Sequence, residues 1–255
     1  MKETVLWGRS LKKSFGKAEI IKDIDIDIYR GDFTVVMGTS GSGKSTLLHL
    51  LSGMDTVSGG EICYISAKAS NSERSITNAT EKEMAKIRAN DFGFVFQKAH
   101  LVSNLTLYEN IQMAGYVSDK LSEKEVEVRA DQYIQKMALT DAKNRLPSEA
   151  SGGEAQRAAV ARALMTEPEI VFADEPTGAL NRANTKAVLE LFAGIHAEGQ
   201  TILMVTHDRE AALYGNRILY LEDGRICGEL ILSHYQGKDS DREKKLHMWL
   251  EKMRW

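Results

Sequence analysis

The chain of 255 residues is long enough for one α/β domain with a small inserted subdomain, and its composition is that of an ordinary globular protein. Its net charge of −3 argues against a nucleic-acid partner, and no apolar run is long enough to cross a bilayer. Without a signal peptide, and with Cys63 and Cys227 too few for a disulfide scaffold or a four-ligand zinc site, we expect a cytoplasmic protein.

Strands and helices alternate along much of the chain. Short apolar runs bounded by polar or turn residues predict buried parallel strands at Phe33–Met37, Phe92–Phe96, Ile170–Ala173 and Thr201–Val205. Apolar residues at helical spacing predict a helix over Thr185–Ala197. The alternation predicts an α/β fold with a P-loop-type core, a mixed and mostly parallel sheet, and helices on both faces.

Antiparallel strands are expected at the edge of this sheet. The segments Arg217–Leu221 and Arg225–Leu230 flank Glu222-Asp223-Gly224, and Asp-Gly is a strong hairpin signal. Ser66–Asn78 is polar and nearly devoid of large apolar residues, which predicts a surface loop.

Two segments are expected to contain helices and no strands. Residues 98–150 include a capping box, Ser122 with Glu125, and predict a helical subdomain inserted in a single domain over residues 1–230. Residues 231–255 predict an amphipathic helical tail. Its capping box is expected at Ser240 and Glu243, and its apolar stripe comprises Leu246, Trp249, Leu250 and Met253.

A glycine-rich loop follows the predicted strand Phe33–Met37 and leads into a helix. Its residues fit the pattern G-x-x-x-x-G-K-[ST], in which the backbone N–H groups converge on phosphate oxygens. Lys44 is expected to reach the β- and γ-phosphates, Ser45 to bind Mg²⁺, and Thr46 to hydrogen-bond the α-phosphate. A chance glycine-rich turn would not require the strand before it and the helix after it. The loop consists of Gly38, Thr39, Ser40, Gly41, Ser42, Gly43, Lys44 and Ser45.

Two acids end the predicted strand Ile170–Ala173. Asp174 suits a contact with Mg²⁺ through water, and Glu175 could polarise a water for in-line attack on a γ-phosphate. Two acids at a strand end are more often a solvated edge. The interpretation as a catalytic pair therefore depends on the phosphate loop.

A second glycine-containing segment begins an alanine-rich helix that runs to about Leu164. Exposed N–H groups at a helix start, with a serine hydroxyl beside them, could bind an anion. Alone, the segment would be interpreted as a turn that caps the helix. Its residues are Ser151, Gly152, Gly153 and Glu154.

The order of these motifs resembles the ATP-binding cassette (ABC) family over about residues 3–230, with Gln97 after a strand and His207 in Val205-Thr206-His207-Asp208 completing the set. The resemblance implies that two copies of the chain pair head to tail. Each ATP would then lie between the phosphate loop of one copy and Ser151–Glu154 of the other.

The resemblance also implies roles for single residues. Gln97 would contact Mg²⁺ and the attacking water, and His207 would hold the γ-phosphate. Phe15 stands where the family stacks an aromatic ring on adenine, although it could equally be a core residue. Asn181 occupies the position of a usual aspartate in a loop that crosses the dimer interface, so hydrolysis could be slower while ATP binding remains intact. Ala150 replaces a usual leucine and is expected to change only local packing.

The segments Leu101–Asn110 and Phe172–Leu180 resemble the branch that serves macrolide export, lipoprotein release and cell-division complexes, and within it the bacitracin-type peptide-antibiotic resistance systems of Gram-positive bacteria. This resemblance implies ATP and Mg²⁺ as cofactors and a transmembrane permease as partner, at the cytoplasmic face of the membrane. The expected docking surface comprises Leu101, Val102, Leu105 and Leu107, some of which could be core.

Three alternatives remain open on the sequence alone. The chain could serve a lipoprotein-release or cell-division complex, or be a cassette ATPase that acts on DNA or ribosomes. It could also be a regulatory module that holds ATP without hydrolysing it. No residue identifies the transported molecule.

Overall fold

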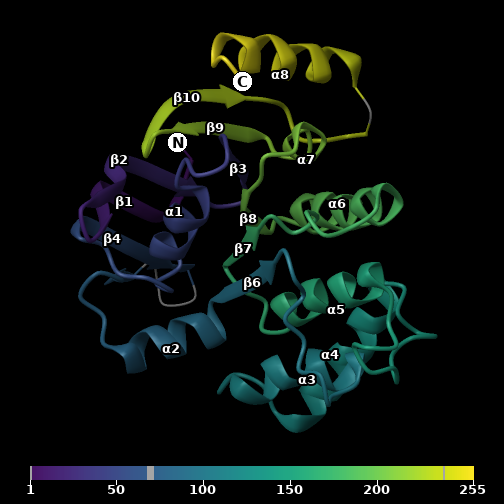
Figure 1. Cartoon of the computed structure of the whole chain (residues 1–255). Coiled ribbons are helices and arrows are strands. Elements are labelled where there is room, and N and C mark those ends of the chain that lie inside the picture. Colours follow the sequence, from purple (N-terminus) through teal and green to yellow (C-terminus); the bar gives the residue numbers. More distant parts are fainter. Residues whose placement is uncertain (1, 68–71, 238) are drawn as a thin grey trace. The chain divides into compact units, whose positions relative to one another are not determined.

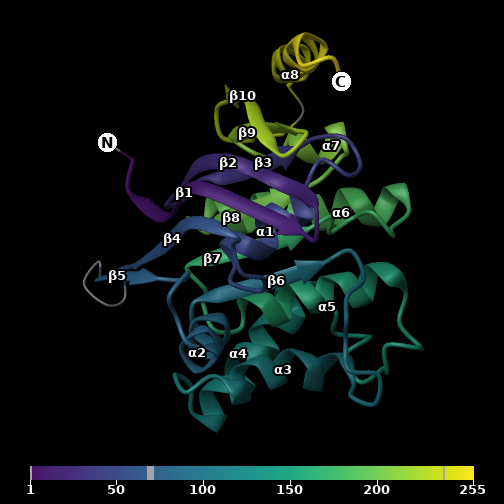
Figure 2. The same cartoon turned by 60° about the vertical axis from the view of Figure 1, so that its left-hand side comes forward.

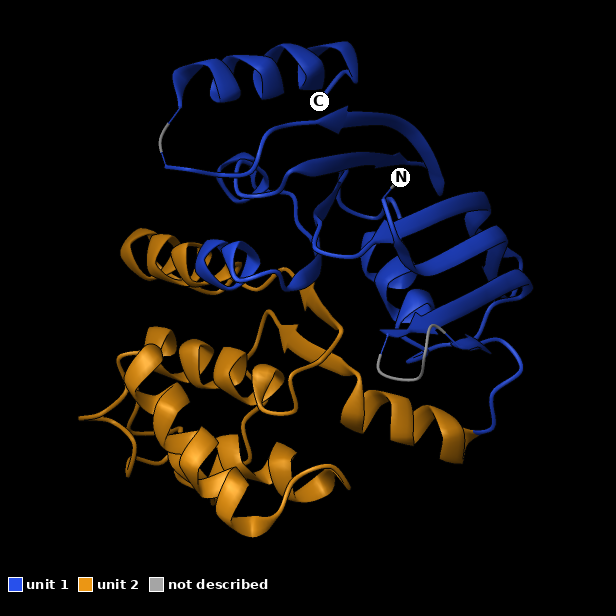
Figure 3. Ribbon diagram, turned by 180° about the vertical axis from the view of Figure 1, so that it is seen from behind, with its two compact units in different colours: residues 1–80, 193–255 blue, residues 81–192 orange. Residues whose placement is uncertain are grey.

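The computed structural model describes residues 2–67, 72–237 and 239–255. The chain divides into two compact units (Figure 3). Unit 1 comprises Met1–Thr80 and Ala193–Trp255, and unit 2 comprises Glu81–Phe192. Figures 1 and 2 label their elements.

The first sheet of unit 1 is antiparallel and has the strand order β2-β1-β4-β5. Its strands are β1 (Thr4–Phe15), β2 (Ala18–Tyr29), β4 (Gly59–Ser66) and β5 (Ser72–Ser75). The prediction of a surface loop over Ser66–Asn78 is therefore wrong at β5, while residues 68–71 lie outside the described residues. An edge strand such as β5 needs no apolar face, because pairing with β4 satisfies its backbone on one side.

The second group of strands in unit 1 has the order β10-β9-β3-β8. Strand β3 is parallel to both β8 and β9, and β9 pairs with β10 in an antiparallel hairpin. All residues of β3 and β8 are buried, which explains their continuous apolar sequences. Asp223 and Gly224 have φ values of 46° and 75°, as the tight turn of this hairpin requires. The strands are β3 (Phe33–Met37), β8 (Thr201–Val205), β9 (Arg217–Glu222) and β10 (Arg225–Ile231).

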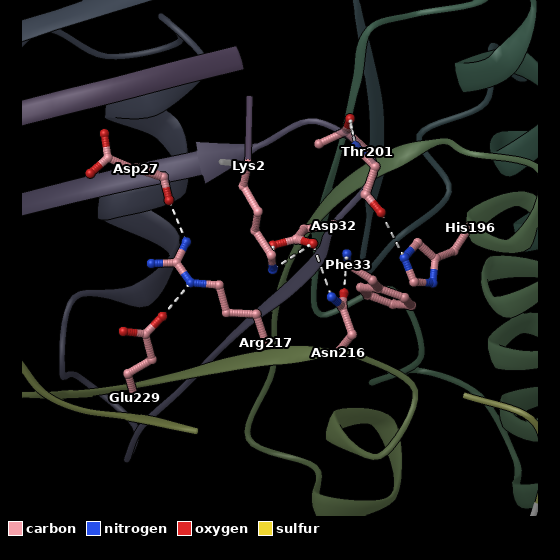
Figure 4. Close-up of polar contacts among 10 residues, drawn as sticks. Lys2, Asp27, Asp32, Phe33, His196, Thr201, Asn216, Arg217 and Glu229 are labelled. Carbon is pink, nitrogen blue, oxygen red and sulfur yellow. Dashed lines mark hydrogen bonds and ion pairs between the residues drawn. The ribbon is translucent and has the colours of Figure 1, made fainter. Parts of the chain in front are cut away.

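Polar groups fix the amino end of β3 (Figure 4). Lys2 Nζ lies 2.7 Å from Asp32 Oδ2, and Asn216 Nδ2 donates to Asp32 Oδ1 over 2.9 Å. Asn216 Oδ1 accepts from the backbone N–H of Phe33 at 2.6 Å. The side chain of Asn216 thus joins the starts of β3 and β9, and the opposite end of β3 carries the phosphate loop.

Unit 1 also contains the helices α1 (Lys44–Leu51), the short α7 (Arg209–Ala212) and α8 (Ser240–Lys252). Helix α8 extends along β9 and β10 (Figure 1), and the rings of Trp249 and Tyr220 are nearly perpendicular, with centroids 6.3 Å apart. The predicted capping box at Ser240 is wrong by one position. Asp239 is the N-cap, because its carboxylate accepts from the N–H of Asp241, and Ser240 is the first helical residue.

Unit 2 contains two parallel strands and several helices. Strand β6 (Phe92–Phe96) pairs with β7 (Ile170–Asp174), and α3 packs against α5. Between residues 98 and 150, all of which are described, the chain forms helices α3 and α4 and no strand. The domain boundary at residue 230 stays a prediction. The helices are α2 (Glu81–Asn90), α3 (Leu107–Val117), α4 (Glu123–Lys136), α5 (Gly152–Leu164) and α6 (Arg182–Ala197), which continues into unit 1.

Candidate active site

The glycine-rich loop connects the end of β3 to the start of α1. Lys44, the first residue of α1, is only 6% exposed, and its ammonium group donates to the carbonyl oxygens of Gly38 at 2.8 Å and Thr39 at 2.9 Å. Gly43 is the N-cap of α1, with a left-handed φ of 101° that a side chain would disfavour. The loop therefore wraps back over the lysine that the sequence assigns to the phosphates.

The geometry of this loop fits a phosphate ligand. At Gly41, where φ is 81°, an added Cβ would meet nothing within 4 Å. The hydroxyl of Ser42 is buried and has no hydrogen-bond partner among the residues that the structure describes. A curled backbone at the positive end of a helix, with a buried hydroxyl unsatisfied, suits a polyanion. Ser45 and Thr46 lie half-buried in the first turn of α1.

The β9–β10 hairpin packs against the backbone of the phosphate loop. A Cβ at Gly38 would lie 2.1 Å from the carbonyl oxygen of Leu221, and Gly224 N–H donates to Ser42 O over 3.2 Å. The loop backbone thus rests against two points of the hairpin. No motif in the sequence pointed to this contact.

His207 lies at the same strand edge as the phosphate loop. Val36 of β3 pairs with Val205 of β8, and the N–H of Thr206 donates to Val36 O at 3.1 Å. The residues that follow both strands therefore emerge together. His207 is exposed, and Asp208 caps α7 through the N–H of Glu210.

Phe15 ends strand β1 and is 55% exposed. The ammonium of Lys13 lies 4.8 Å from the centre of its ring. This exposure excludes the alternative that Phe15 is a core residue. Stacking on adenine stays a prediction that the exposed ring permits.

Unit 2 brings Gln97, Asp174 and Glu175 together. Phe96 of β6 pairs with Asp174 of β7, so Gln97 and Glu175 both follow the carboxyl ends of paired strands. A Cβ added at Gly178 would lie 2.9 Å from Gln97 Nε2, so the glutamine side chain lies against the loop after Glu175. Asp174 and Glu175 are half-buried, and Gln97 is exposed.

Glu175 has a left-handed backbone, with φ of 47°. For a residue with a side chain this conformation is sparsely populated and costs about 1–3 kcal/mol. The carbonyl of Glu175 accepts the N–H of Gly178 at 3.0 Å, which closes the turn. This turn bends the chain sharply at the end of β7, and the position of the Glu175 carboxylate depends on that bend. Nothing in the sequence predicted this backbone.

Ser151 is the N-cap of α5 and forms a capping box with Glu154. Ser151 Oγ accepts from Glu154 N at 3.2 Å, and Glu154 Oε2 accepts from Ser151 N at 2.7 Å. The hydrogen bonds that Ser151 donates hold the pKa of the Glu154 carboxyl below its ordinary value. Arg145 also contacts Glu154, at 3.1 Å. These contacts give Ser151 and Glu154 a capping role beside the predicted contact with ATP in a second copy.

Close packing explains the second glycine of this segment. A Cβ at Gly153 would lie 2.5 Å from the side chain of Asn184 in α6. One turn further along α5, Gln156 Nε2 donates to Phe96 O at 2.8 Å. Helix α5 is thereby tied to the residue that precedes Gln97, a link the sequence motif alone did not reveal.

Asn181, which departs from the family pattern, caps α6. Its Oδ1 accepts from the N–H of Asn184 at 3.0 Å. Aspartate caps helices about as well as asparagine, so capping does not distinguish the two residues. The effect of Asn181 on hydrolysis stays a prediction.

The predicted docking surface is smaller than the sequence suggested. Leu107 is fully buried at the start of α3 and belongs to the core, whereas Leu101, Val102 and Leu105 are half-buried. The buried amide of Asn110 holds this segment, since it accepts from Val102 N at 2.7 Å and donates to the carbonyls of Val102 and Leu105.

The expected Mg²⁺ ligands are few. In the described part of the chain, no three His, Cys, Asp or Glu side chains gather as a metal cluster. Mg²⁺ is commonly bound by one or two protein side chains together with substrate phosphates. The Ser45 hydroxyl at the start of α1 and the Asp174 carboxylate at the end of β7 are suitable oxygen donors.

Within the described ranges, no helix is both long and apolar enough to span a membrane.

Relatives of known name match most of this chain. The macrolide export ATP-binding/permease protein MacB of Aggregatibacter actinomycetemcomitans is 40% identical over 87% of this chain, which spans only 34% of that protein. The lipoprotein-releasing system ATP-binding protein LolD of Aquifex aeolicus is 41% identical over 89% of this chain and 97% of its own length. The bacitracin export ATP-binding protein BceA of Halalkalibacterium halodurans is 39% identical, over 89% of this chain and 88% of its own length.

A solved structure and a family model lead to the same family as these relatives. A dimeric post-hydrolysis state of the ATP-binding cassette MJ0796, bound to ADP and Pi, aligns with a TM-score of 0.79 and 32% identity, covering 90% of this chain and 100% of that one. The family model for ABC transporters matches residues 21–178. The chain therefore belongs to the ABC transporter family and carries the ATPase domain of that family.

Proposed function

We propose that this chain hydrolyses ATP to drive a membrane permease, and that the complex protects against cell-wall-directed peptide antibiotics. The observation that carries the proposal is the placement of Gln97, Asp174 and Glu175 at the carboxyl ends of β6 and β7. In unit 1 the phosphate loop and His207 follow β3 and β8 in the same way. These are the groups that phosphoryl transfer to water requires.

Each residue has a distinct task in this proposal. Lys44 and the loop N–H groups bind the phosphates, and His207 contacts the γ-phosphate. Glu175 accepts a proton from the attacking water, which Gln97 helps to orient. Mg²⁺, held by Ser45 and Asp174, neutralises charge on the phosphate oxygens when it is bound.

A second copy of the chain completes the proposed site. The N-terminus of α5 presents Ser151 and two glycines, a suitable anion-binding end. In the head-to-tail arrangement, Ser151–Glu154 of one copy covers the ATP held by the phosphate loop of the other. The dimeric state of the cassette MJ0796 supports this proposal.

The proposed permease contact is the half-buried segment of Leu101, Val102 and Leu105. It directly follows β6 and Gln97, and Asn110 holds its backbone from within. A cytoplasmic helix of the permease that rests there would act on the segment that carries Gln97. The complex would lie at the cytoplasmic face of the membrane.

The transported molecule is the most specific part of the proposal. Similarity to BceA, at 39% identity over 88% of its length, favours bacitracin-type peptides. Similarity to LolD, at 41% over 97% of its length, favours lipoprotein release. Both relatives match this chain along most of their own length. Resistance and lipoprotein sorting are therefore the two phenotypes to compare.

The test places a charge on the proposed contact. Val102→Glu should leave the ATPase rate of the isolated chain within about twofold, because the residue lies outside the phosphate-binding groups. Copurification with the permease and bacitracin resistance should fall together. The control is Val128→Glu, at a residue of α4 that is 51% exposed, which should change none of the three.

Two outcomes would contradict the proposal. If detergent extracts yield no membrane protein with the chain, and if its gene can be deleted without a change in antibiotic sensitivity, the transport function is wrong. If deletion instead leaves lipoproteins in the inner membrane while resistance is intact, the lipoprotein-release alternative replaces the peptide-antibiotic cargo.

A further inference from the structure

We propose that Arg242, in the C-terminal helix α8, is a positioning residue that acts on His207 through the short helix α7. The inference rests on the proposed hydrolysis of ATP and extends it to a part of the chain outside the residues 21–178 that the family model matches. All groups concerned lie in unit 1.

The guanidinium of Arg242 is buried and binds three backbone carbonyls. Its Nε donates to Leu213 O at 2.6 Å, and its two terminal nitrogens donate to the carbonyls of Gly215 and Ser233. The residue is only 4% exposed. A planar group with donors in a fixed fork can satisfy several acceptors at once, which the single ammonium of a lysine cannot do in the same geometry.

Two of these carbonyls end the α7 segment. Leu213 is the C-cap of α7, and Gly215 lies two residues beyond it. A positive group at the end of a helix satisfies carbonyls that have no partner within the helix. Since α7 has only four residues, it has too few internal hydrogen bonds to be stable without outside contacts.

The other end of α7 begins beside His207. A continuous series of backbone hydrogen bonds runs from Asp208 O, which accepts from Ala212, to Gly215 N, which donates to Ala212 O. Asp208 caps the helix, and its own N–H donates to the hydroxyl of Thr206. His207 therefore lies between Thr206, whose N–H donates to Val36 O in β3, and Asp208, which begins the first turn of α7.

Helix α8 has its own attachment to unit 1. Leu246 and Leu250 are buried, at 2% and 0% exposure, and Met253 and Trp249 fill the space over Gly228 in β10. Packing of α8 thus fixes the position from which Arg242 reaches α7. Loosening Arg242 should free the end of α7 and allow the His207 segment to move.

The expected effect is on turnover and not on nucleotide affinity. His207 is assigned to the γ-phosphate, and a displacement of about 1 Å in a catalytic group can lower the rate by about 100-fold. The triphosphate is bound mainly by the phosphate loop, which Arg242 does not touch. Arg242→Ala should therefore lower kcat at least about tenfold and leave the Kd for Mg²⁺-ATP within about twofold.

Two variants separate positioning from stability. Ile28→Ala removes a buried apolar side chain of β2, outside α8 and the phosphate loop, and should lower the unfolding midpoint about as much as Arg242→Ala, yet retain kcat, because Arg242 stays in place. Arg242→Lys keeps the charge but not the fork and should lower kcat. If Ile28→Ala lowers kcat as much as Arg242→Ala at matched stability, the positioning role is wrong.

A double-mutant cycle tests the route through His207. In a His207→Ala background, Arg242→Ala should cause no further loss of kcat, because its effect has no remaining target. A full additional loss would overturn the inference. The proposed function and this inference can fail separately. If the wild-type chain hydrolyses no ATP, the proposed function is wrong. The NMR signals of the His207 ring then test whether Arg242 positions the His207 segment. They should shift in nucleotide-free Arg242→Ala, and unchanged signals would contradict the inference.

Discussion

At the residue scale, the most informative feature is the backbone of Glu175. A left-handed conformation at φ of 47° is costly for a residue with a side chain, and it occurs where β7 ends and the candidate base begins. The neighbouring Asp174 continues the regular strand. Asp174 thus keeps the extended backbone of the strand while Glu175 departs from it, which suits their separate proposed tasks in binding Mg²⁺ and activating water.

Replacing this carboxylate tests its role as base. Glu175→Gln keeps the size and shape of the side chain and removes its charge, so turnover should fall by about 10²–10⁴. Mg²⁺-ATP should still bind, and an ATP-dependent dimer should accumulate, because the closed pair cannot release its nucleotide through hydrolysis. Phosphate release and light scattering measure the two effects. A variant that hydrolyses ATP at nearly the wild-type rate would remove Glu175 from the mechanism.

His196 makes the stability of unit 1 depend on pH. Burial lowers the pKa of this histidine, and its partners His234 and Arg242 lower it further, against the carbonyl of Gly31 and the carboxylate of Asp32, which raise it. The His196 ring stacks on that of His234 with centroids 4.9 Å apart, and Nε2 lies 3.0 Å from Gly31 O. The folded protein therefore keeps His196 neutral at a pH where the unfolded chain already binds a proton.

This difference fixes the sign of the pH effect. As the pH decreases through the ordinary pKa of 6.5, the unfolded state takes up the proton first. The free energy of unfolding should therefore decrease as the pH decreases, by at most about 1.4 kcal/mol per pH unit for this group. His196→Gln, which can still donate to Gly31 O, should reduce the loss between pH 7.5 and 5.5 in urea unfolding. His247→Gln, at an exposed histidine, should not. Equal pH dependence in His196→Gln and the wild type would refute the assignment.

At the element scale, the β9–β10 hairpin acts as a support for the phosphate loop. Gly224 has φ of 75°, and a Cβ there would lie 2.3 Å from the carbonyl oxygen of Ile20. Its N–H donates to Ser42 O in the loop. Gly199 also has a positive φ, of 97°, but a Cβ there would meet nothing within 4 Å.

These two glycines form a matched pair. Both alanine variants should lose about 1–2 kcal/mol of stability from the left-handed backbone. Gly224→Ala should in addition displace the hairpin from the loop and weaken ATP binding about tenfold or more, measured by calorimetry. Gly199→Ala should bind ATP normally. If both variants retain wild-type affinity at a temperature where they are folded, the hairpin does not shape the loop.

The predictability of the elements follows from their surroundings. Strands β3, β6 and β8 have mostly apolar sequences because all residues of β3 and β8 and three of the five residues of β6 are buried, and their predicted bounds match the structure. Strand β1 was not predicted, since register shifts and the positive φ of Ser10 interrupt its alternation. Strand β2 does carry a strand signal in its sequence, because Ile24, Ile26 and Ile28 are buried and alternate with aspartates.

At the scale of the whole molecule, sequence motifs located most of the candidate site because each one directly follows a strand or precedes a helix. Asp174 and Gln97 are at strand ends because parallel pairing places them there. What the motifs could not give are contacts between distant segments: Leu221 with Gly38, Asn184 with Gly153, and Arg242 with α7. Such contacts depend on packing, which no local pattern encodes.

The central claim is that hydrolysis requires two copies of the chain, because each copy has one phosphate loop and one separate α5 N-terminus to offer. The most direct measurement mixes two variants that are each nearly inactive, Lys44→Ala and Ser151→Arg, and follows phosphate release. A mixed dimer rebuilds one intact site, so mixing should restore part of the activity, and dilution should abolish turnover before it abolishes ATP binding. No recovery on mixing, together with wild-type specific activity that is independent of concentration in a proven monomer, would contradict the account.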